Sequence, residues 1–155
     1  IASSADEETI CDLFNEHSGG LYAFRRCYEM LVEAGISTEA AMLEFWASGE
    51  SADVTEVIQS HGLFGQIKFH SRTSQYGQEV TGRLSDEEEA AERTRLRKLL
   101  AHIKDGTFAK DWTLEQQAGY PILNRVYQQN MAHPMTELEK QLLQAMKLWR
   151  GDDPD

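Results

Sequence analysis

The chain has 155 residues, of which 41% are hydrophobic and 26% are charged, a composition typical of a soluble globular domain. Its formal net charge is −11, from 26 acidic and 15 basic residues. This excess of acid argues against a nucleic-acid partner, because contacts to phosphates need clustered Lys and Arg. No apolar run approaches the roughly 20 residues of a membrane-spanning helix, so we expect no membrane partner either.

The two cysteines, Cys11 and Cys27, are too few for a disulfide scaffold. We expect both to be free thiols with packing roles, in a reducing, cytoplasmic compartment. No segment resembles a signal peptide. The chain begins at Ile1 rather than Met, which indicates that an upstream part has been removed or lies outside this sequence.

The first half of the chain has the pattern of successive helices. Residues 11–17, CDLFNEH, suit a helix, and residues 19–35 carry an apolar stripe with a terminating glycine. That stripe consists of Leu21, Phe24, Tyr28 and Leu31. The next helix is expected to begin at Ser37 or Thr38, which are good N-cap residues. A shorter helix is expected over residues 53–60.

The second half is also helical after one polar segment. Residues 69–82 contain two glycines and no helical stripe, so we expect an ordered loop with room for a short extended piece. Ser85 and Glu88 form a capping-box pattern that starts a long helix ending near Gly106. Helices follow at 107–119, at about 122–131 and at 136–149, the last with a second capping-box pattern at Thr136 and Glu139.

Together these elements predict an all-α fold, organised as a single helical domain over residues 1–155 without a Rossmann domain. Large apolar residues recur on several modest helices, and such helices often complete their core against a partner subunit. The residues in question are Trp46, Phe64, Trp112 and Trp149.

Motifs of nucleotide and nucleophile chemistry are absent from the sequence. No G-x-G-x-x-G turn, P-loop or G-x-S-x-G elbow occurs, so we predict no cofactor-binding residues. No histidine has a Glu three residues before it, unlike the E-x-x-H pattern of di-iron bundles. We expect surface or hydrogen-bonded roles for all five: His17, His61, His70, His102 and His133.

Carboxylates are the candidates for a metal site. Asp12 and Glu16 share one face if residues 11–17 are helical. Glu44 stands in an otherwise apolar segment, so it either reaches water or is paired with a cation. Glu50 follows six residues later. Mg²⁺ prefers oxygen ligands, and two or three carboxylates from different helices would suffice; a solvated helix face is the alternative.

Four stretches resemble the C-terminal knotted domain of class I ketol-acid reductoisomerases: DLFNEH, LVEAGISTEAAMLE, GLFGQIKFHSRTSQYGQEVTG and IKDGTFAKDWTLEQQAGYP. The resemblance covers about Thr9 to Trp149. It implies an all-helical domain that forms an intertwined homodimer with a deep knot, an exception among folds. In this family an N-terminal Rossmann domain binds NADPH, and the enzyme couples Mg²⁺-dependent alkyl migration to reduction in branched-chain amino-acid biosynthesis.

The resemblance also implies roles for individual carboxylates. Asp12 and Glu16 match the metal ligands that one chain contributes to two Mg²⁺ ions. Glu44 matches the first of two glutamates contributed by the partner chain. The second is expected four residues later, where Ser48 stands. Glu50 is the candidate to replace it and is our candidate catalytic residue.

Ser71 matches the serine that holds the substrate carboxylate, and the implied substrate is a small 2-hydroxy-2-methyl-3-oxo acid. The segment between His17 and the following Gly-Gly is about three residues shorter than in the family, which changes a region that lines the metal site.

Three functional hypotheses follow. The chain is the C-terminal domain of a reductoisomerase, dependent on a Rossmann partner for reduction; or it is a stand-alone relative that acts as a metal-dependent isomerase without reduction; or it is a non-catalytic helical dimerisation module. The altered Glu44–Glu50 region favours the second hypothesis. The retained residues argue against the third, namely Asp12, Glu16, Glu44 and Ser71. In each case the chain alone should not catalyse hydride transfer.

Overall fold

The computed structural model describes residues 4–150, and every regular element in this range is helical. The predicted all-α fold is therefore confirmed. The first elements are α1 (Ala5–His17), α2 (Gly20–Glu33), α3 (Thr38–Met42), the π-helix η1 (Leu43–Ala47), α4 (Glu50–His61) and the 3-10 helix η2 (Gly65–Phe69). The remainder are α5 (Arg72–Tyr76), the π-helix η3 (Gly77–Thr81), α6 (Asp86–Lys104), α7 (Thr107–Gln117), α8 (Pro121–Met131) and α9 (Pro134–Ala145).

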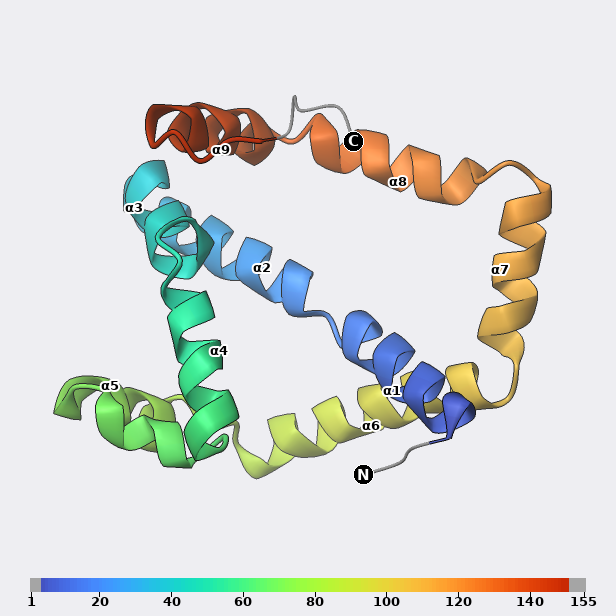
Figure 1. Cartoon of the computed structure of the whole chain (residues 1–155), viewed down its shortest axis with the longest axis horizontal. Coiled ribbons are helices and arrows are strands. Elements are labelled where there is room, and N and C mark those ends of the chain that lie inside the picture. The colour runs from blue at the N-terminus through green and yellow to red at the C-terminus, as the bar shows by residue number, and fades with distance from the viewer. Residues whose placement is uncertain (1–3, 151–155) are drawn as a thin grey trace.

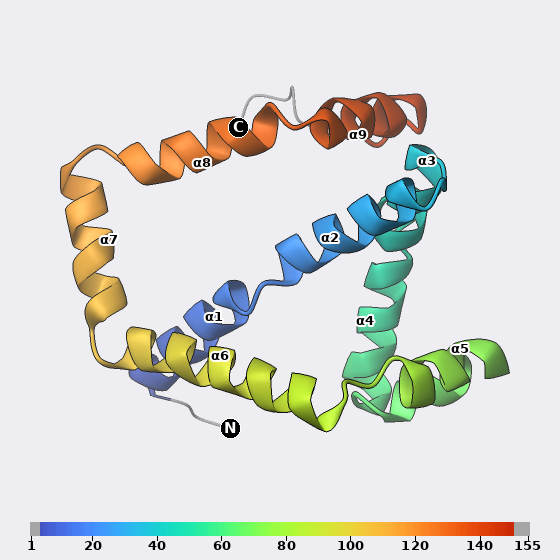
Figure 2. The same ribbon diagram turned by 180° about the vertical axis from the view of Figure 1, so that it is seen from behind.

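The helices form an open, four-sided frame with one diagonal (Figures 1 and 2). The sides are α4, α6, α7 and the pair α8 and α9, and α1 and α2 run one after the other across the frame. At one end of this diagonal α1 packs along α6, and at the other end α3 packs against both α2 and α9. Consequently α1 and η1, which carry the candidate metal ligands, lie at opposite ends of the diagonal.

Local sequence signals explain where these helices begin. Ser4 and Ser85 each accept a hydrogen bond from a first-turn backbone N–H, and the carboxylates of Glu7 and Glu88 each accept one from the backbone N–H of the cap residue. Both are reciprocal capping boxes, and the one at Ser85 confirms the start predicted for α6. The joint between α1 and α2 relies on Gly19, whose φ of 102° is unfavourable for residues with a Cβ.

The main buried cluster joins α2, α3 and η1. It consists of Tyr28, Ala41, Met42 and Ala47, with leucines of α9 packed against it, namely Leu138, Leu142 and Leu143. On α6 Ile103 is also buried. The predicted stripe of α2 is only partly covered, since Leu21 remains 75% exposed.

The chain leaves far more surface exposed than a folded monomer of its mass. It exposes 12207 Å², whereas about 7,900 Å² is expected for a compact monomer of 17.6 kDa. The apolar faces of several helices are therefore not covered by the chain itself. None of the helices in residues 4–150 combines the length and apolar character that a bilayer crossing requires.

Residues 69–82 are helical over most of their length, so the predicted loop is wrong. Ser71 caps α5 by accepting a hydrogen bond from the Ser74 backbone N–H at 3.2 Å. One turn later Gln78 Nε2 donates to Ser74 Oγ at 3.0 Å. These local polar contacts stabilise a helix that has no apolar stripe, and for that reason hydrophobic periodicity did not reveal it.

The capping box predicted at Thr136 and Glu139 is wrong as well. The helix α9 begins two residues earlier, at Pro134, a residue whose fixed φ favours the first helical position. Its cap is His133, whose Nδ1 accepts the Met135 backbone N–H at 3.2 Å. The helix also ends at Ala145 rather than at the predicted Trp149.

The two cysteines are free, as predicted, but they are not packing residues. Cys11 and Cys27 are both exposed.

Candidate metal and substrate site

The helix α1 presents Asp12 and Glu16 one turn apart, as the sequence predicted. Both residues are exposed, and among residues 4–150 no hydrogen bond or ion pair engages either carboxylate. Asp12 lines a shallow surface hollow together with Glu7, Glu8, Cys11 and Asn15. The pair is therefore free to bind a cation without first losing a protein partner.

Glu44 lies in the π-helix η1, whose wide turn is seen in the hydrogen bond from Ser48 N–H to Leu43 O at 3.2 Å. Its side chain is exposed. Of the two alternatives predicted for Glu44, contact with water or pairing with a cation, the structure shows contact with water. Single-turn π-helices occur frequently at functional sites. No local sequence pattern indicated this π-helix.

Glu50 is separated from Glu44 by a break in the helix. Gly49, with a φ of 85°, ends the first segment, and Glu50 is the first residue of α4. The backbone N–H of Glu50 donates to Ser48 Oγ at 3.3 Å. Position 48 therefore still belongs to the turn of Glu44, whereas Glu50 starts a new helix with its own direction.

Ser71 is exposed and acts as the N-cap of α5. Its hydroxyl oxygen accepts the Ser74 backbone N–H, which leaves the hydroxyl proton available to donate to a ligand oxygen.

One chain does not assemble these residues into one site. Within the described part of the chain, no group of three or more His, Cys, Asp or Glu side chains lies close enough to hold a metal ion. Asp12 and Glu16 are on α1, and Glu44 is at the far end of the diagonal, beyond α2 (Figure 1). In a single chain the candidate ligands thus lie in separate places.

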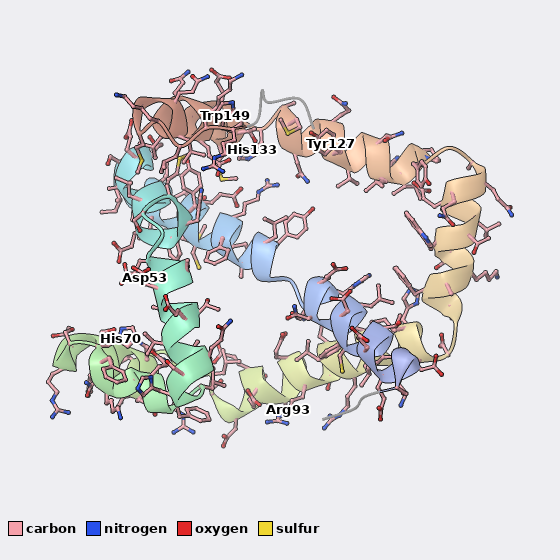
Figure 3. All side chains as sticks on the ribbon, in the orientation of Figure 1. Asp53, His70, Arg93, Tyr127, His133 and Trp149 are labelled. Atoms are coloured by element: carbon pink, nitrogen blue, oxygen red, sulfur yellow. The ribbon has the colours of Figure 1, made fainter. Side chains whose placement is uncertain are left out.

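The histidines have the hydrogen-bonded roles predicted for them. His17 Nδ1 contacts Leu13 O at 2.6 Å, and His61 Nδ1 lies 2.8 Å from Ser60 Oγ. At the junction of α8 and α9, His133 faces Glu29 of α2, with Nε2 3.6 Å from Oε1 (Figure 3).

Glu29 also forms an ion pair with Arg25, one turn earlier on α2, and this pair favours the ionised carboxylate. A hydrogen bond from Arg25 Nε at 2.8 Å lowers the pKa of Glu29, and the charges of Arg25 and His133 lower it further. The same region borders a cavity of about 420 Å³ lined mainly by apolar groups of α2, η1 and α9, including Phe24, Trp46 and Met135. This cavity does not include the candidate metal ligands.

Two long-range hydrogen bonds within the chain, next to the candidate ligands, were not predicted from the sequence. Trp46 Nε1 donates to Glu139 Oε1 at 2.6 Å, and Arg95 Nη2 donates to Ser18 O at 2.8 Å. Because they join residues 93 and 77 positions apart, no local sequence signal reveals them.

Chemically, the available donors fit Mg²⁺. The ion prefers carboxylate oxygens and retains several waters, so one or two carboxylates per segment are enough. Asp12, Glu16 and Glu44 are exposed carboxylates without a protein partner in residues 4–150. No group of the described residues suits a soft or nitrogen-preferring metal better.

The fold and these residues define an all-helical domain that exposes candidate carboxylate ligands at separate places. Comparison with known proteins assigns the family: residues 6–148 match the family described as "Ketol-acid reductoisomerase, C-terminal domain". The chain therefore belongs to the ketol-acid reductoisomerase family, as the sequence motifs indicated.

Individual relatives agree with this assignment. The chain is 38% identical over 151 residues to "Putative ketol-acid reductoisomerase 3" of Saccharolobus solfataricus, covering 95% of this chain and 45% of that protein. It is 36% identical over 151 residues to "Ketol-acid reductoisomerase (NADP(+))" of Saccharopolyspora erythraea, covering 94% and 44%. The chain thus spans less than half the length of these relatives.

A solved structure confirms the fold. An NADH-preferring ketol-acid reductoisomerase from an uncultured archean superposes with a TM-score of 0.77 at 24% identity, over 95% of this chain and 44% of that one. At this identity the likeness establishes the helical architecture alone.

Proposed function

We propose that this chain is the Mg²⁺- and substrate-binding C-terminal domain of a ketol-acid reductoisomerase and works as part of a larger enzyme. The observation that carries the proposal is the exposed, unpartnered Asp12–Glu16 pair on α1, at the positions where the family has metal ligands. The relatives are more than twice as long as the matched region. Binding of NADPH is therefore assigned to a separate N-terminal Rossmann domain.

Asp12 and Glu16 would hold the cation from one chain, and Glu44 of a second chain would complete the set. When bound, Mg²⁺ would polarise the ketone of a 2-hydroxy-2-methyl-3-oxo acid and stabilise the alkoxide formed during alkyl migration. The Ser71 hydroxyl would donate a hydrogen bond to the substrate carboxylate and so fix its orientation.

Homodimer formation is part of this proposal. The exposed area of each chain exceeds that of a compact monomer by about 4,300 Å², and large obligate interfaces bury from about 2,000 to more than 5,000 Å² over both partners together. An interlocked partner that passes alongside α1 and α2 would cover the exposed apolar residues of the frame. It would also bring a second η1 towards α1.

A stand-alone isomerase without reduction is the second candidate. It is favoured by Ser48, which stands where the family has its second glutamate and instead accepts a hydrogen bond from Glu50 N–H. In that case the metal ligands would act as proposed, but no nicotinamide domain would be needed.

Calorimetric titration of the intact protein with MgCl₂ tests the proposal. We expect binding by the parent, its loss in Asp12→Asn, and unchanged binding in the control Asp53→Asn, an exposed acid on α4 that matches no family ligand (Figure 3). Absence of binding by the parent, or equal affinity in Asp12→Asn, would overturn the assignment of the metal site.

A further inference from the structure

Two long-range hydrogen bonds have their ends next to the candidate metal ligands. The Trp46–Glu139 bond joins η1 to α9, and Trp46 is two residues beyond Glu44. The Arg95–Ser18 bond joins α6 to the C-terminal cap of α1, and Ser18 is two residues beyond Glu16. Each ligand-bearing segment is thus tied to a different helix of the frame.

We propose that Glu139 and Arg95 are positioning residues that fix the carboxylates of η1 and α1 for the cation. This inference rests on the metal site of the proposed function, because without a cation there is nothing to position. Neither residue is a ligand. Each acts through the segment whose backbone or indole it holds.

The η1 segment needs an external support because its own backbone restrains it weakly. It is a single π-helical turn, followed by Gly49 in a left-handed conformation. Trp46 is half-buried against the main core cluster, and its indole N–H meets a carboxylate, so the bond is charge-assisted and short. Rotation of η1, which would swing Glu44, requires breaking this bond.

The α1 segment has the same weakness at Gly19. The left-handed glycine joins α1 to α2 with no side-chain cap on the second helix. Arg95 bridges the joint: its Nη2 donates to Ser18 O, while Glu92 accepts two bonds from the guanidinium at 2.7 and 2.8 Å. The latter bonds lower the pKa of Glu92 and raise that of Arg95.

Only Ser18 and Gly19 separate α1 from α2 at the joint that Arg95 spans. A small change in backbone angle at Gly19 therefore redirects the whole of α1. A guanidinium held by Glu92 on α6 restricts that change, and α1 packs on the same helix.

Truncation and conservative variants separate positioning from general stability. Glu139→Met and Arg95→Met remove the bonds, whereas Glu139→Gln keeps an acceptor for the indole N–H. Glu137→Met and Arg93→Met are matched controls. Glu137 binds Gln141 within α9, and Arg93 pairs with Glu89 within α6 (Figure 3). Both controls lose a polar contact that does not join two elements.

Two quantities are measured on the intact protein: the melting temperature without metal, and the Kd for Mg²⁺ by calorimetry. We expect Glu139→Met and Arg95→Met to weaken Mg²⁺ binding about 10-fold, the lower end of the range for groups that orient ligands. Glu139→Gln should retain most of the affinity, and both controls should bind as the parent does. If Glu139→Met does not fold, Trp46→Phe removes the same bond from the other side.

The outcomes distinguish this inference from the proposed function. A parent that binds Mg²⁺, with loss in Asp12→Asn but parental affinity in Glu139→Met and Arg95→Met, overturns the positioning roles alone. A lower melting temperature with unchanged Kd has the same meaning, since it shows a purely structural bond. A parent that binds no Mg²⁺ overturns the proposed function and, with it, this inference.

Discussion

Trp46 and Glu139 are joined by a 2.6 Å hydrogen bond between the indole Nε1 and Oε1, although 93 positions separate them. This bond connects the turn that carries Glu44 with α9, the last helix of the described residues. In Trp46→Phe the half-buried Glu139 loses its donor, which should lower the free energy of unfolding by about 1–3 kcal/mol. Urea denaturation measures this. Trp112→Phe, at a half-exposed site on α7, should change it much less; equal effects would contradict the role of the bond.

Met42 is the largest fully buried side chain of the described residues, with 1% exposure. Met42→Ala should destabilise the fold by about 2–5 kcal/mol, because it removes buried area and leaves a cavity. Met30→Ala, at a position that is 56% exposed, should stay within about 0.5 kcal/mol. Denaturant unfolding of both variants checks the prediction. Similar losses of unfolding free energy in both variants would show that Met42 does not belong to the core.

The capping box of α6 predicts a defined pH dependence. Hydrogen bonds from the Ser85 hydroxyl and backbone N–H lower the pKa of Glu88 from its ordinary value of 4.5. A lowered folded-state pKa contributes stability above the unfolded pKa, and this stability is lost as the pH falls through the folded value. The melting temperature of Glu88→Gln should therefore lie below the parent's near neutral pH and approach it towards about pH 2.

If the difference in melting temperature between the parent and Glu88→Gln persists unchanged at low pH, the prediction is contradicted, because ionised Glu88 would then not stabilise the parent. Glu87→Gln is the control, because Glu87 lies in the same first turn without a bond to Ser85.

The sequence predicted most helix boundaries because they follow local chemistry. Ser37 and Ser85 cap helices as expected, and Gly106 separates α6 from α7. The errors have an equally local origin. The helix α9 begins at Pro134 with His133 as its cap, and not at the predicted Thr136. The helix α5 is stabilised by polar contacts, which hydrophobic periodicity does not detect.

In the candidate site as well, local features were predictable from the sequence and long-range contacts were not. Asp12 and Glu16 were predictable because four-residue spacing on a helix fixes a shared face. Pairings at long range were not: Arg95 on Ser18 and Glu139 on Trp46 depend on how the frame closes. The full set of candidate metal ligands was proposed only through the resemblance to the family, since no cluster of described residues marks it within one chain.

A pair of variants tests whether Glu50 replaces the glutamate that the resemblance leads us to expect at position 48. If Glu50 supplies the missing carboxylate, Glu50→Gln should weaken Mg²⁺ binding. Adding Ser48→Glu in that background should restore it, because position 48 lies about one turn from Glu44. Calorimetric titration of the two variants measures this. Unchanged binding in Glu50→Gln would show that Glu50 supplies no ligand, and no rescue by Ser48→Glu would show that a carboxylate at position 48 does not take its place.

Mg²⁺ should also raise the melting temperature of the parent through linkage. At a concentration 100 times the Kd, a ligand that binds only the folded state stabilises it by about 2.7 kcal/mol. Asp12→Asn should remove the shift. An unchanged shift in this variant would mean that Mg²⁺ binds elsewhere on the acidic surface.

The central claim is that the cation site takes α1 from one chain and η1 from another. The most direct measurement is Mg²⁺ titration of a mixed dimer, made by co-expressing Asp12→Asn and Glu44→Gln chains with different tags. Each variant dimer alone should bind no Mg²⁺, and the mixed dimer should recover one site, formed by the unaltered α1 and the unaltered η1. No recovery, or a purely monomeric mass in solution, would contradict a shared site.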